Sequence, residues 1–438
     1  MSTATSIAPD PRQQARAVRD AQRQLGSAAG SQRTAVLRRL AELLEERQDH
    51  LLTANRRDLE AARAANLAAP LLGRLELSPA KLATLREGIE QLATDDDPIG
   101  RLVRATQLDD GLTLRQVHSP LGVLLIIFES RPDAVVQIGS LALRSGNGVI
   151  LKGGSEARHS NRALVGVLRD ALAAEDLPPD AVCGVEGREA VQELLELDEL
   201  IDLVIPRGSS ALVRSIQAST RIPVLGHSEG ICHLFLDASA DPAMATRLAL
   251  DGKCGYPTAC NAVETLLVHR DFLPRLTELG RALIDRGVEL RADDEARAHL
   301  PAAEPAADED WATEYGALTL AIRTVTDLDQ ALDHIHRYGS AHTEAIVTQD
   351  LESRERFLRQ VDAASVFVNA STRFADGYRY GLGAEVGIST AKVHARGPVG
   401  VEGLLTTRWL LEGNGQTADD YGPGKKSFQH QSLAVDRE

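Results

Sequence analysis

Short apolar segments alternate with helical segments through the middle of this 438-residue chain, and this pattern restricts the fold more than any other feature. LGVLLIIF (121–128) is followed by an expected helix over 134–145, and GVILKG (148–153) is followed by another over 156–172. DLVIPRG (202–208) begins a third repeat. Segments that are apolar at every position are typical of strands buried on both faces, and helices between them connect parallel neighbours. The pattern predicts an α/β fold with a doubly wound parallel sheet.

Further apolar segments extend this pattern toward the C-terminus. IPVLG (222–226) and ICHLFLD (231–237) are expected as additional strands. A second doubly wound α/β unit is expected over 241–375. The region before this α/β pattern has apolar positions at helical spacing, most clearly over 33–66, and is predicted to be helical.

A polar segment of alternating character, over 102–117, separates the helical region from the first apolar strand. Asp109, Asp110 and Gly111 lie at its middle. An Asp-Gly pair between alternating residues favours a β-hairpin with a tight turn. We expect this hairpin to be an arm that reaches another subunit.

Composition and charge exclude several classes of protein. The chain has 48 Lys and Arg against 63 Asp and Glu, a net charge of −15, whereas a general nucleic-acid or membrane-surface binder needs a basic face. Four cysteines without a CxxC pair do not form a disulfide scaffold or a zinc site, so we expect no metal and a reducing compartment. The N-terminus has no apolar signal core, and no apolar run approaches the ~20 residues that span a bilayer. We therefore expect a cytoplasmic protein without nucleic-acid or membrane partners.

Polar or basic groups follow three of the predicted parallel strands, where ligands of open α/β sheets bind. Each group precedes a helix, whose first N–H groups favour an anion. One such strand end is explained equally well by a solvated turn, but three together favour a cofactor crevice. No GxGxxG follows a predicted strand and no GxxxxGK[ST] occurs, so the ordinary phosphate-binding motifs are missing. The three groups are Glu129 to Arg131, Lys152 to Ser155, and Arg207 to Ser210.

Among the four cysteines, Cys260 has the most distinctive setting, between a Pro-Thr turn and an apolar strand. A lone cysteine is usually a small buried residue, so spacing alone leaves Cys260 open between a structural and a nucleophilic role. Cys183 and Cys232 lie inside apolar strands and are interpreted as structural, and the structural interpretation is also favoured for Cys254.

Five longer strings indicate a family. They are FESRPDAVVQIGSLALRSGNGVILKGGSEA (128–157), VIPRGSSALV (204–213), PVLGHSEGICHLFLD (223–237), GKCGYPTACNAVETLLVH (252–269) and GLGAEVGISTAKVHARGPVGVEGLLTTRW (381–409). These strings resemble the γ-glutamyl phosphate reductases, also called glutamate-5-semialdehyde dehydrogenases, a branch of the aldehyde-dehydrogenase superfamily. The resemblance is strongest to the reductase half of the plant bifunctional enzyme of proline synthesis, and it covers about residues 15–430.

The resemblance implies an aldehyde-dehydrogenase-like fold, with two doubly wound α/β domains and a small β oligomerisation arm. The expected division is a cofactor-binding domain over 1–101 and 120–240 with about 376–394, a catalytic cysteine domain over 241–375, and an oligomerisation hairpin and C-terminal segment over 102–119 and 395–430.

The resemblance also implies roles for single residues. Cys260 matches the family nucleophile, Lys152 the lysine that contacts the adenosine ribose, and Glu314 the glutamate that holds the nicotinamide ribose. Ser155 stands where NAD-preferring relatives have an acid, and the absence of that acid fits the 2′-phosphate of NADPH. Gly208 and Ser209 are further expected cofactor contacts. The expected substrate contacts are Ser130, Arg131, Asn261 and Arg396, and Arg207 is a further candidate for the substrate's anionic groups.

Two departures from hydrolytic aldehyde dehydrogenases carry information. The position of their general-base glutamate falls near Gly226 and His227, where this chain has no carboxylate. This absence is consistent with a thioester intermediate, because a general base there would activate water to hydrolyse it. Their oxyanion-binding asparagine aligns with Ser130, which leaves the backbone N–H of Cys260 as a candidate donor.

The function that the resemblance implies is NADPH-dependent reduction of L-glutamyl 5-phosphate to L-glutamate 5-semialdehyde and phosphate, through a thioester on Cys260, in proline biosynthesis. It further implies a homo-oligomer and a separate glutamate 5-kinase. Three alternatives remain: a reductase of another acyl phosphate or an acyl-CoA, a non-redox cysteine hydrolase or acyltransferase with His227 or His269 as base, and a binding protein that has kept only the fold.

Overall fold

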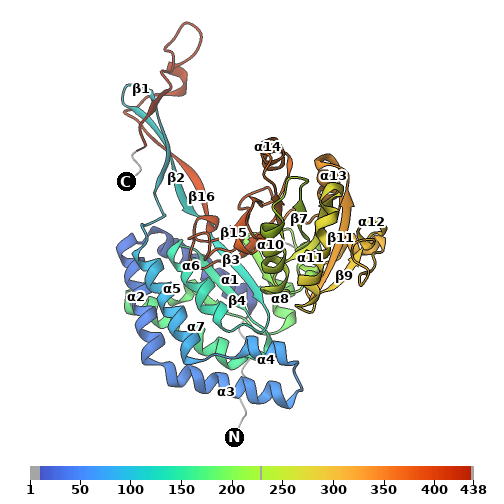
Figure 1. The fold of residues 1–438 in the computed structure, drawn as a ribbon. Coiled ribbons are helices and arrows are strands. Elements are labelled where there is room, and N and C mark those ends of the chain that lie inside the picture. Colours follow the sequence, from blue (N-terminus) through green and yellow to red (C-terminus); the bar gives the residue numbers. More distant parts are fainter. Residues whose placement is uncertain (1–9, 227–228, 436–438) are drawn as a thin grey trace.

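The computed structural model describes residues 10–226 and 229–435 (Figure 1). The chain forms a helix-rich lobe from its first half, a second lobe from residues beyond about 230, and a long arm that projects from the body. The predicted α/β fold with parallel sheets is confirmed. No helix among the described residues is long and apolar enough to cross a membrane.

The predicted N-terminal helices are present because their apolar residues recur on one face. Leu37, Leu40 and Leu44 are completely buried in the core of the first lobe. The stretch where the helical spacing is clearest, over 33–66, contains two helices that meet at Arg47. The helices are α1 (Pro11–Ser27), α2 (Gly30–Glu46), α3 (Gln48–Ala64), α4 (Ala69–Leu75) and α5 (Pro79–Thr94).

The first parallel sheet has the strand order β5-β4-β3-β6. Alternate residues of its central strand enter two separate cores: Ile126 packs on one face of the sheet and Ile127 on the other. The sheet is therefore covered on both faces. Its strands are β3 (Val123–Phe128), β4 (Gly148–Lys152), β5 (Val182–Gly184) and β6 (Leu203–Arg207), and its helices are α6 (Asp133–Arg144), α7 (Arg158–Ala174), α8 (Arg188–Leu194) and α9 (Ser210–Ser219).

The second parallel sheet has seven strands in the order β10-β9-β11-β8-β7-β12-β13. Cores also cover both of its faces, with Leu266 on one side and Leu267 on the other. Its strands are β7 (Cys232–Leu236), β8 (Val263–His269), β9 (Glu289–Ala292), β10 (Glu304–Pro305), β11 (Thr319–Val325), β12 (Thr343–Val347) and β13 (Ser365–Val368), and its helices are α10 (Pro242–Cys254), α11 (Leu273–Ile284), α12 (Asp294–Arg297), α13 (Leu328–Tyr338) and α14 (Leu351–Gln360).

Two expected strands differ from the prediction. The segment over 222–226 forms only an isolated bridge between Val224 and Val204, because Pro223 has no N–H for a ladder. The segment over 231–237 gives β7, which pairs with β8 and β12. The chain thus enters the second sheet at residue 232, whereas the sequence placed this strand in the cofactor-binding domain expected over 120–240. The division into domains itself stays a prediction.

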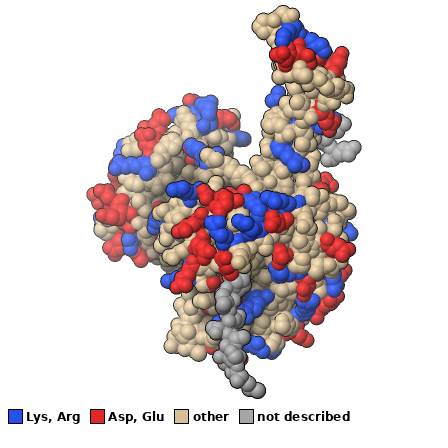
Figure 2. Space-filling view, turned by 180° about the vertical axis from the view of Figure 1, so that it is seen from behind, with Lys and Arg blue, Asp and Glu red and all other residues tan. Residues whose placement is uncertain are grey.

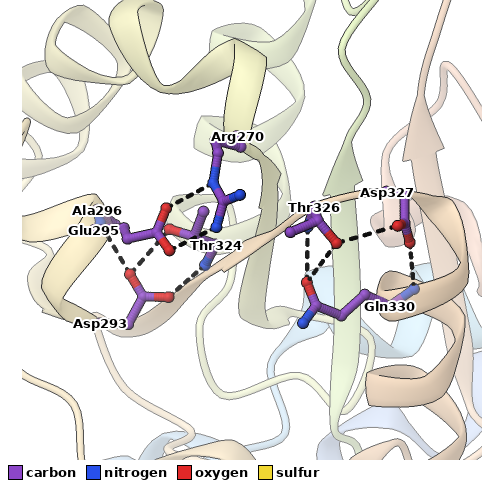
Figure 3. A network of polar contacts seen from close by, with 8 residues as sticks. All are labelled: Arg270, Asp293, Glu295, Ala296, Thr324, Thr326, Asp327 and Gln330. Atoms are coloured by element: carbon purple, nitrogen blue, oxygen red, sulfur yellow. Dashed lines mark hydrogen bonds and ion pairs between the residues drawn. The ribbon is translucent and has the colours of Figure 1, made fainter.

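A network of polar contacts lies at the carboxyl ends of β9 and β11 (Figure 3). The carboxylate of Asp293 accepts hydrogen bonds from the Thr324 N–H at 2.6 Å and the Thr324 hydroxyl at 2.9 Å, and it caps α12 through the Ala296 N–H. Arg270 meets Glu295 in a two-pronged ion pair beside it. These contacts fix the ends of β9 and β11 to each other.

The arm is a four-stranded antiparallel sheet in the order β16-β2-β1-β17. The predicted hairpin is confirmed: β1 (Leu102–Asp109) and β2 (Leu112–Pro120) are joined at Asp110 and Gly111, and Gly111 has a φ of +69°. The C-terminal segment adds β16 (Leu405–Glu412) and β17 (Gln431–Leu433). Figure 2 shows the arm from behind, with acidic and basic side chains intermixed over the body.

Candidate active site

Cys260 lies in the loop between α10 and β8, against the start of β7. The Cys232 thiol donates to the Cys260 carbonyl oxygen over 3.3 Å. Gly230 packs on the same backbone, since a Cβ on Gly230 would lie 2.7 Å from the Cys260 Cα. The loop is fastened on its other side by Asn261, whose Nδ2 donates to the Ala375 carbonyl at 2.9 Å. Contacts from two distant segments, around residues 230–232 and at Ala375, thus hold Cys260.

Cys260 opens into a cavity of about 660 Å³ between the carboxyl end of β6 and the loops of the second lobe. Seven of the predicted site residues line it together: Arg131, Arg207, Gly208, Ser209, Cys260, Asn261 and Glu314. The same cavity contains Glu129, which belongs to the first predicted polar group, and four polar side chains that the sequence did not indicate, namely Tyr256, Arg373, Asp376 and Glu385.

The charged groups around Cys260 have opposite effects on the pKa of its thiol. Burial, followed by the carboxylates of Glu314 and Glu385, raises the pKa of the Cys260 thiol to about 12, while Arg207 acts to lower it. Arg207 is thus a cation close enough to the sulfur to favour the thiolate. Because the pKa remains high, the thiol of the protein without ligands is protonated near neutral pH.

Glu385 and Arg207 form the polar wall beside Cys260. The Arg207 Nη1 donates to the Glu385 carbonyl at 3.1 Å, and the Glu385 carboxylate accepts from the Gly377 N–H at 2.9 Å. Burial raises the pKa of Glu385, with Arg207 opposing it. Glu385 lies inside a string that identified the family, but its 125-residue separation from Cys260 (385 − 260) hid their proximity.

A second cavity, of about 740 Å³, begins at the carboxyl ends of β3 and β4. Lys152 and Ser155 line it as predicted, and it shares Leu71, Arg74 and Glu129 with the Cys260 cavity. The shared residues make the two cavities neighbours along one crevice. The three predicted strand ends therefore meet at this crevice, as the parallel topology requires.

Ser130 lies in the second cavity, where it binds Glu156. Its N–H and its hydroxyl donate to one Glu156 carboxylate oxygen at 2.8 and 2.7 Å, and its φ is +42°. Burial acts to raise the pKa of Glu156, but the hydrogen bonds and the charge of Lys152 outweigh it and hold the pKa below its ordinary value. The structure thus does not bring Ser130 to the wall of the Cys260 cavity, because its hydroxyl is turned to a carboxylate 26 residues away.

The residues of this crevice fit a dinucleotide. Lys152 forms no salt bridge with any described residue, so its ammonium is available to ribose hydroxyls. Ser209 caps α9, and a helix N-terminus of this kind favours a phosphate. A Cβ on Gly153 would lie 2.9 Å from the Phe128 ring, and one on Gly208 would lie 2.7 Å from the Glu129 carboxylate. Because glycine has no side chain, the backbone itself forms the wall of the crevice at both positions.

Two predicted or proposed residues lie elsewhere. Arg396 does not line the Cys260 cavity: its Nη2 pairs with Asp362 at 2.9 Å, and it faces a separate cavity at the base of the arm. The segment that carries it turns back through β15 (Gly397–Val399), which draws the side chain away from Cys260. His269 is at the end of β8 and accepts from the Asp271 N–H, also outside the cavity. His227 lies outside the described residues.

The other cysteines are free thiols, like Cys260. Cys232 is completely buried, and burial raises its pKa well above the ordinary value. Cys183 lines the Lys152 cavity although it was interpreted as structural, and burial raises its pKa to about 11. Cys254 is half-buried on a different surface groove. Of the four, Cys260 alone shares a cavity with Glu314.

The fold and a cysteine cavity that opens beside a dinucleotide crevice define an oxidoreductase of the aldehyde dehydrogenase type. The aldehyde dehydrogenase family model matches residues 3–300. The γ-glutamyl phosphate reductase of Synechococcus sp. strain WH7803 is 51% identical over 436 residues, 99% of this chain and 100% of that protein. The enzyme of the same name from Pelotomaculum thermopropionicum is 49% identical over 98% of each chain.

Solved structures agree. The crystal structure of γ-glutamyl phosphate reductase from Thermotoga maritima has a TM-score of 0.90 and 38% identity, covering 93% of this chain and 99% of that one. An acetylating aldehyde dehydrogenase from Geobacillus thermoglucosidasius, at 15% identity and a TM-score of 0.65, covers 93% of this chain and 97% of that one and shares the fold. The chain belongs to the aldehyde dehydrogenase family and, within it, to the γ-glutamyl phosphate reductases. It is an oxidoreductase with a reductase role in proline biosynthesis. Reductases of this family use nicotinamide cofactors.

Proposed function

We propose that the protein reduces L-glutamyl 5-phosphate with NADPH to L-glutamate 5-semialdehyde and phosphate, through a thioester on Cys260. The observation that carries this proposal is the single crevice in which the Cys260 cavity, with Glu314, adjoins the Lys152 cavity. A sulfur nucleophile and a dinucleotide site must adjoin in this way for hydride to reach an acyl group on the sulfur.

In the first step the Cys260 sulfur bonds to the acyl carbon, the carbon–oxygen bond to phosphate breaks, and inorganic phosphate leaves with the thiol proton. Phosphate is a good leaving group, so the step needs little help from an acid. Bound NADPH supplies the hydride that reduces the thioester carbonyl. The thiohemiacetal on Cys260 then collapses: its carbon–sulfur bond breaks, the aldehyde is released, and the thiolate takes up a proton from solvent.

The cavity walls suit a substrate with anionic groups. Arg131, Arg207 and Arg373 line the Cys260 cavity, and they supply local positive charge in a chain with a net charge of −15. The Arg373 guanidinium lies 5.8 Å from the centre of the Tyr256 ring. It replaces Arg396 as a candidate for binding the anionic groups of the substrate, because Arg396 pairs with Asp362 elsewhere. Asn261 also lines the cavity, and its Oδ1 has no hydrogen-bond partner among the described residues, so this oxygen is available to accept from a donor such as the α-ammonium group of the substrate.

NADPH is proposed over NADH from the residues beyond β4. Ser155 is exposed at the cavity and carries no charge against a 2′-phosphate. Glu156 is the next residue, but its carboxylate is held by the Ser130 N–H and hydroxyl. Lys152 remains as a cation for the ribose or its phosphate. Gly208, Ser209 and Glu314 are proposed to complete the cofactor contacts.

The proposal includes a homo-oligomer in the cytoplasm, supplied with substrate by a separate glutamate 5-kinase. The arm supports the oligomer: Trp409 and Leu411 on β16 are 52% and 57% exposed, and β16 is an edge strand of its sheet. Exposed apolar side chains on a projecting edge strand are typical of contacts between subunits. The four free thiols fit a reducing compartment.

The test is reduction of NADP⁺ by glutamate-5-semialdehyde with and without phosphate, with NAD⁺ and other aldehydes in parallel. Activity that requires both phosphate and this aldehyde is the expected result. Activity without phosphate would indicate a hydrolytic aldehyde dehydrogenase instead. Activity that requires coenzyme A in place of phosphate would indicate an acyl-CoA reductase, and folded protein that binds NADPH without turning over this aldehyde would overturn the substrate assignment.

A further inference from the structure

A buried ion pair lies at the base of the loop that carries Cys260. Lys253 is in the last turn of α10 and Glu264 is the second residue of β8, and the Lys253 Nζ lies 2.5 Å from the Glu264 Oε2. Both residues have a relative exposure of 0%. Because each partner belongs to a regular element, the pair joins the two ends of the intervening loop at a fixed separation.

The second carboxylate oxygen of Glu264 reaches a different loop. The Gly316 N–H donates to Glu264 Oε1 at 3.3 Å. Gly316 has a φ of +56°, a backbone conformation that glycine adopts at little cost. Glu314, which lines the Cys260 cavity, is two residues earlier. One carboxylate therefore contacts both the segment of Cys260 and the segment of Glu314.

Tyr315 fastens the same loop from the opposite direction. Its ring lies 5.8 Å from the Lys253 Nζ and 5.5 Å from the Arg291 guanidinium, within the range of cation–π attraction. Its hydroxyl donates to Asp310 at 2.7 Å, and Arg291 donates to the same carboxylate oxygen at 2.8 Å. Glu314 is thus followed directly by a residue that is packed against the ion pair.

Stability alone does not account for this pair. Removing two charges from water costs free energy, and replacing a buried ion pair by apolar residues of similar volume is often neutral or stabilising. The cost is visible at Glu264, where burial raises the pKa to about 7 although Lys253 and the Gly316 N–H act against it. An apolar replacement would, however, remove the contacts by which Glu264 connects the Cys260 loop to the Glu314 loop.

We propose that Lys253 and Glu264 are positioning residues that align the Cys260 loop with the Glu314 loop, so that the acyl group on the sulfur faces the cofactor that Glu314 holds. The inference rests on the proposed function, in which Glu314 contacts the nicotinamide ribose. Neither residue lines the Cys260 cavity, so both act through the loops that they join.

Two double variants separate the connection from the charge. Lys253→Met with Glu264→Gln removes the ion pair and keeps a side-chain oxygen for the Gly316 N–H. Lys253→Met with Glu264→Leu removes both. The two proteins differ only in whether the Glu314 loop has its acceptor, and both avoid the lone buried charge that a single substitution would leave.

The measurements are NADPH binding by fluorescence titration, kcat and KM in the phosphate-dependent reverse reaction, and the primary deuterium isotope effect with aldehyde deuterated at the reacting carbon. The Leu variant is expected to bind NADPH about fivefold to tenfold more weakly than the Gln variant, the size of one lost hydrogen bond. It is also expected to show a lower kcat and a larger isotope effect, since hydride transfer becomes slower from a misaligned cofactor. A purely structural role would move the melting temperature without separating the variants in these readouts.

Equal NADPH affinity and equal isotope effects in the two double variants would overturn the inference. If the Leu variant does not fold, Glu264→Asp replaces it, because the shorter side chain keeps the charge for Lys253 but cannot reach both partners; the same loss of NADPH affinity is expected. Failure of the proposed function is a separate outcome, since it would show as wild-type protein without phosphate-dependent activity.

Discussion

Gly230 and Cys260 are in direct backbone contact: a Cβ on Gly230 would lie 2.7 Å from the Cys260 Cα and 2.8 Å from its carbonyl carbon. Real Cβ atoms do not approach backbone so closely, so any side chain at position 230 must displace the Cys260 loop. Glycine at this position therefore sets how deeply the sulfur sits in its cavity.

Gly230→Ala is expected to lower kcat/KM on the order of 10²-fold, because a displacement of about 1 Å at a reacting group has an effect of this size. The reverse reaction measures it, with NADPH titration to show that the cofactor crevice is intact. Gly88→Ala is the matched control: its Cβ meets nothing within 4 Å on α5, and activity should not change while the helix gains about 0.5–1 kcal/mol. Wild-type kcat/KM in Gly230→Ala would show that the loop relaxes freely.

Cys260→Ser is expected to lose activity on the order of 10³-fold or more and to keep NADPH binding, because a serine hydroxyl without an adjacent base is a weak nucleophile. Cys254→Ser serves as control, since Cys254 lies on a separate groove. Mass spectrometry after exposure to the acyl phosphate should find a covalent adduct on the wild type and none on Cys260→Ser. Near-normal turnover in Cys260→Ser would end the assignment of this residue as nucleophile.

Alkylation of Cys260 by iodoacetamide should increase with pH. Burial, Glu314 and Glu385 raise the thiol pKa to about 12, so the thiolate fraction, and with it the rate, grows about tenfold per pH unit between pH 7 and 9. Removing a negative charge lowers a raised thiol pKa, so Glu385→Gln should react faster than wild type at pH 8. Removing the positive charge does the opposite, and Arg207→Met should react more slowly.

The exposed Glu355→Gln, on α14, controls for a change of charge alone and should match the wild type. Peptide mapping assigns the alkylated residue. A rate that is already independent of pH between 7 and 9 would contradict the raised pKa.

Ser155→Asp should weaken NADPH binding by roughly tenfold or more and leave NADH binding nearly unchanged, because a carboxylate beside the 2′-phosphate adds repulsion at short range. Titration of the two cofactors gives the comparison. Ser31→Asp, at the exposed start of α2, adds the same charge away from the crevice. An equal loss for both cofactors would place Ser155 away from the 2′-position.

Much of the fold follows from local patterns. The apolar run over 121–128 predicts a buried strand, and β3 occupies most of it because every one of its side chains is buried. The Asp-Gly pair predicts the turn of the arm hairpin, because its position in an alternating segment fixes both strands. Cys260, Lys152 and Ser155 were assigned through strings that resemble a family, and the structure places all three along one crevice.

Other features depend on contacts between residues far apart in the chain. The position of β7 in the second sheet is set by pairing with β12, more than 100 residues later, and no local period contains that information. Arg396 was expected beside the substrate but pairs with Asp362, and Ser130 was expected there but binds Glu156. In both cases the side chain follows its nearest partner of opposite charge or hydrogen-bonding character, which only the folded chain brings near.

By itself the sequence determined most of the strands and helices, because side-chain period is a local property, and its resemblance to a family singled out Cys260 as the expected nucleophile. Only the tertiary structure decided that Glu385 and Arg207 flank the Cys260 sulfur and that Glu264 joins its loop to that of Glu314. The pKa of the thiol and the alignment of the loops arise from burial and from charges brought together by folding, and neither exists in the extended chain.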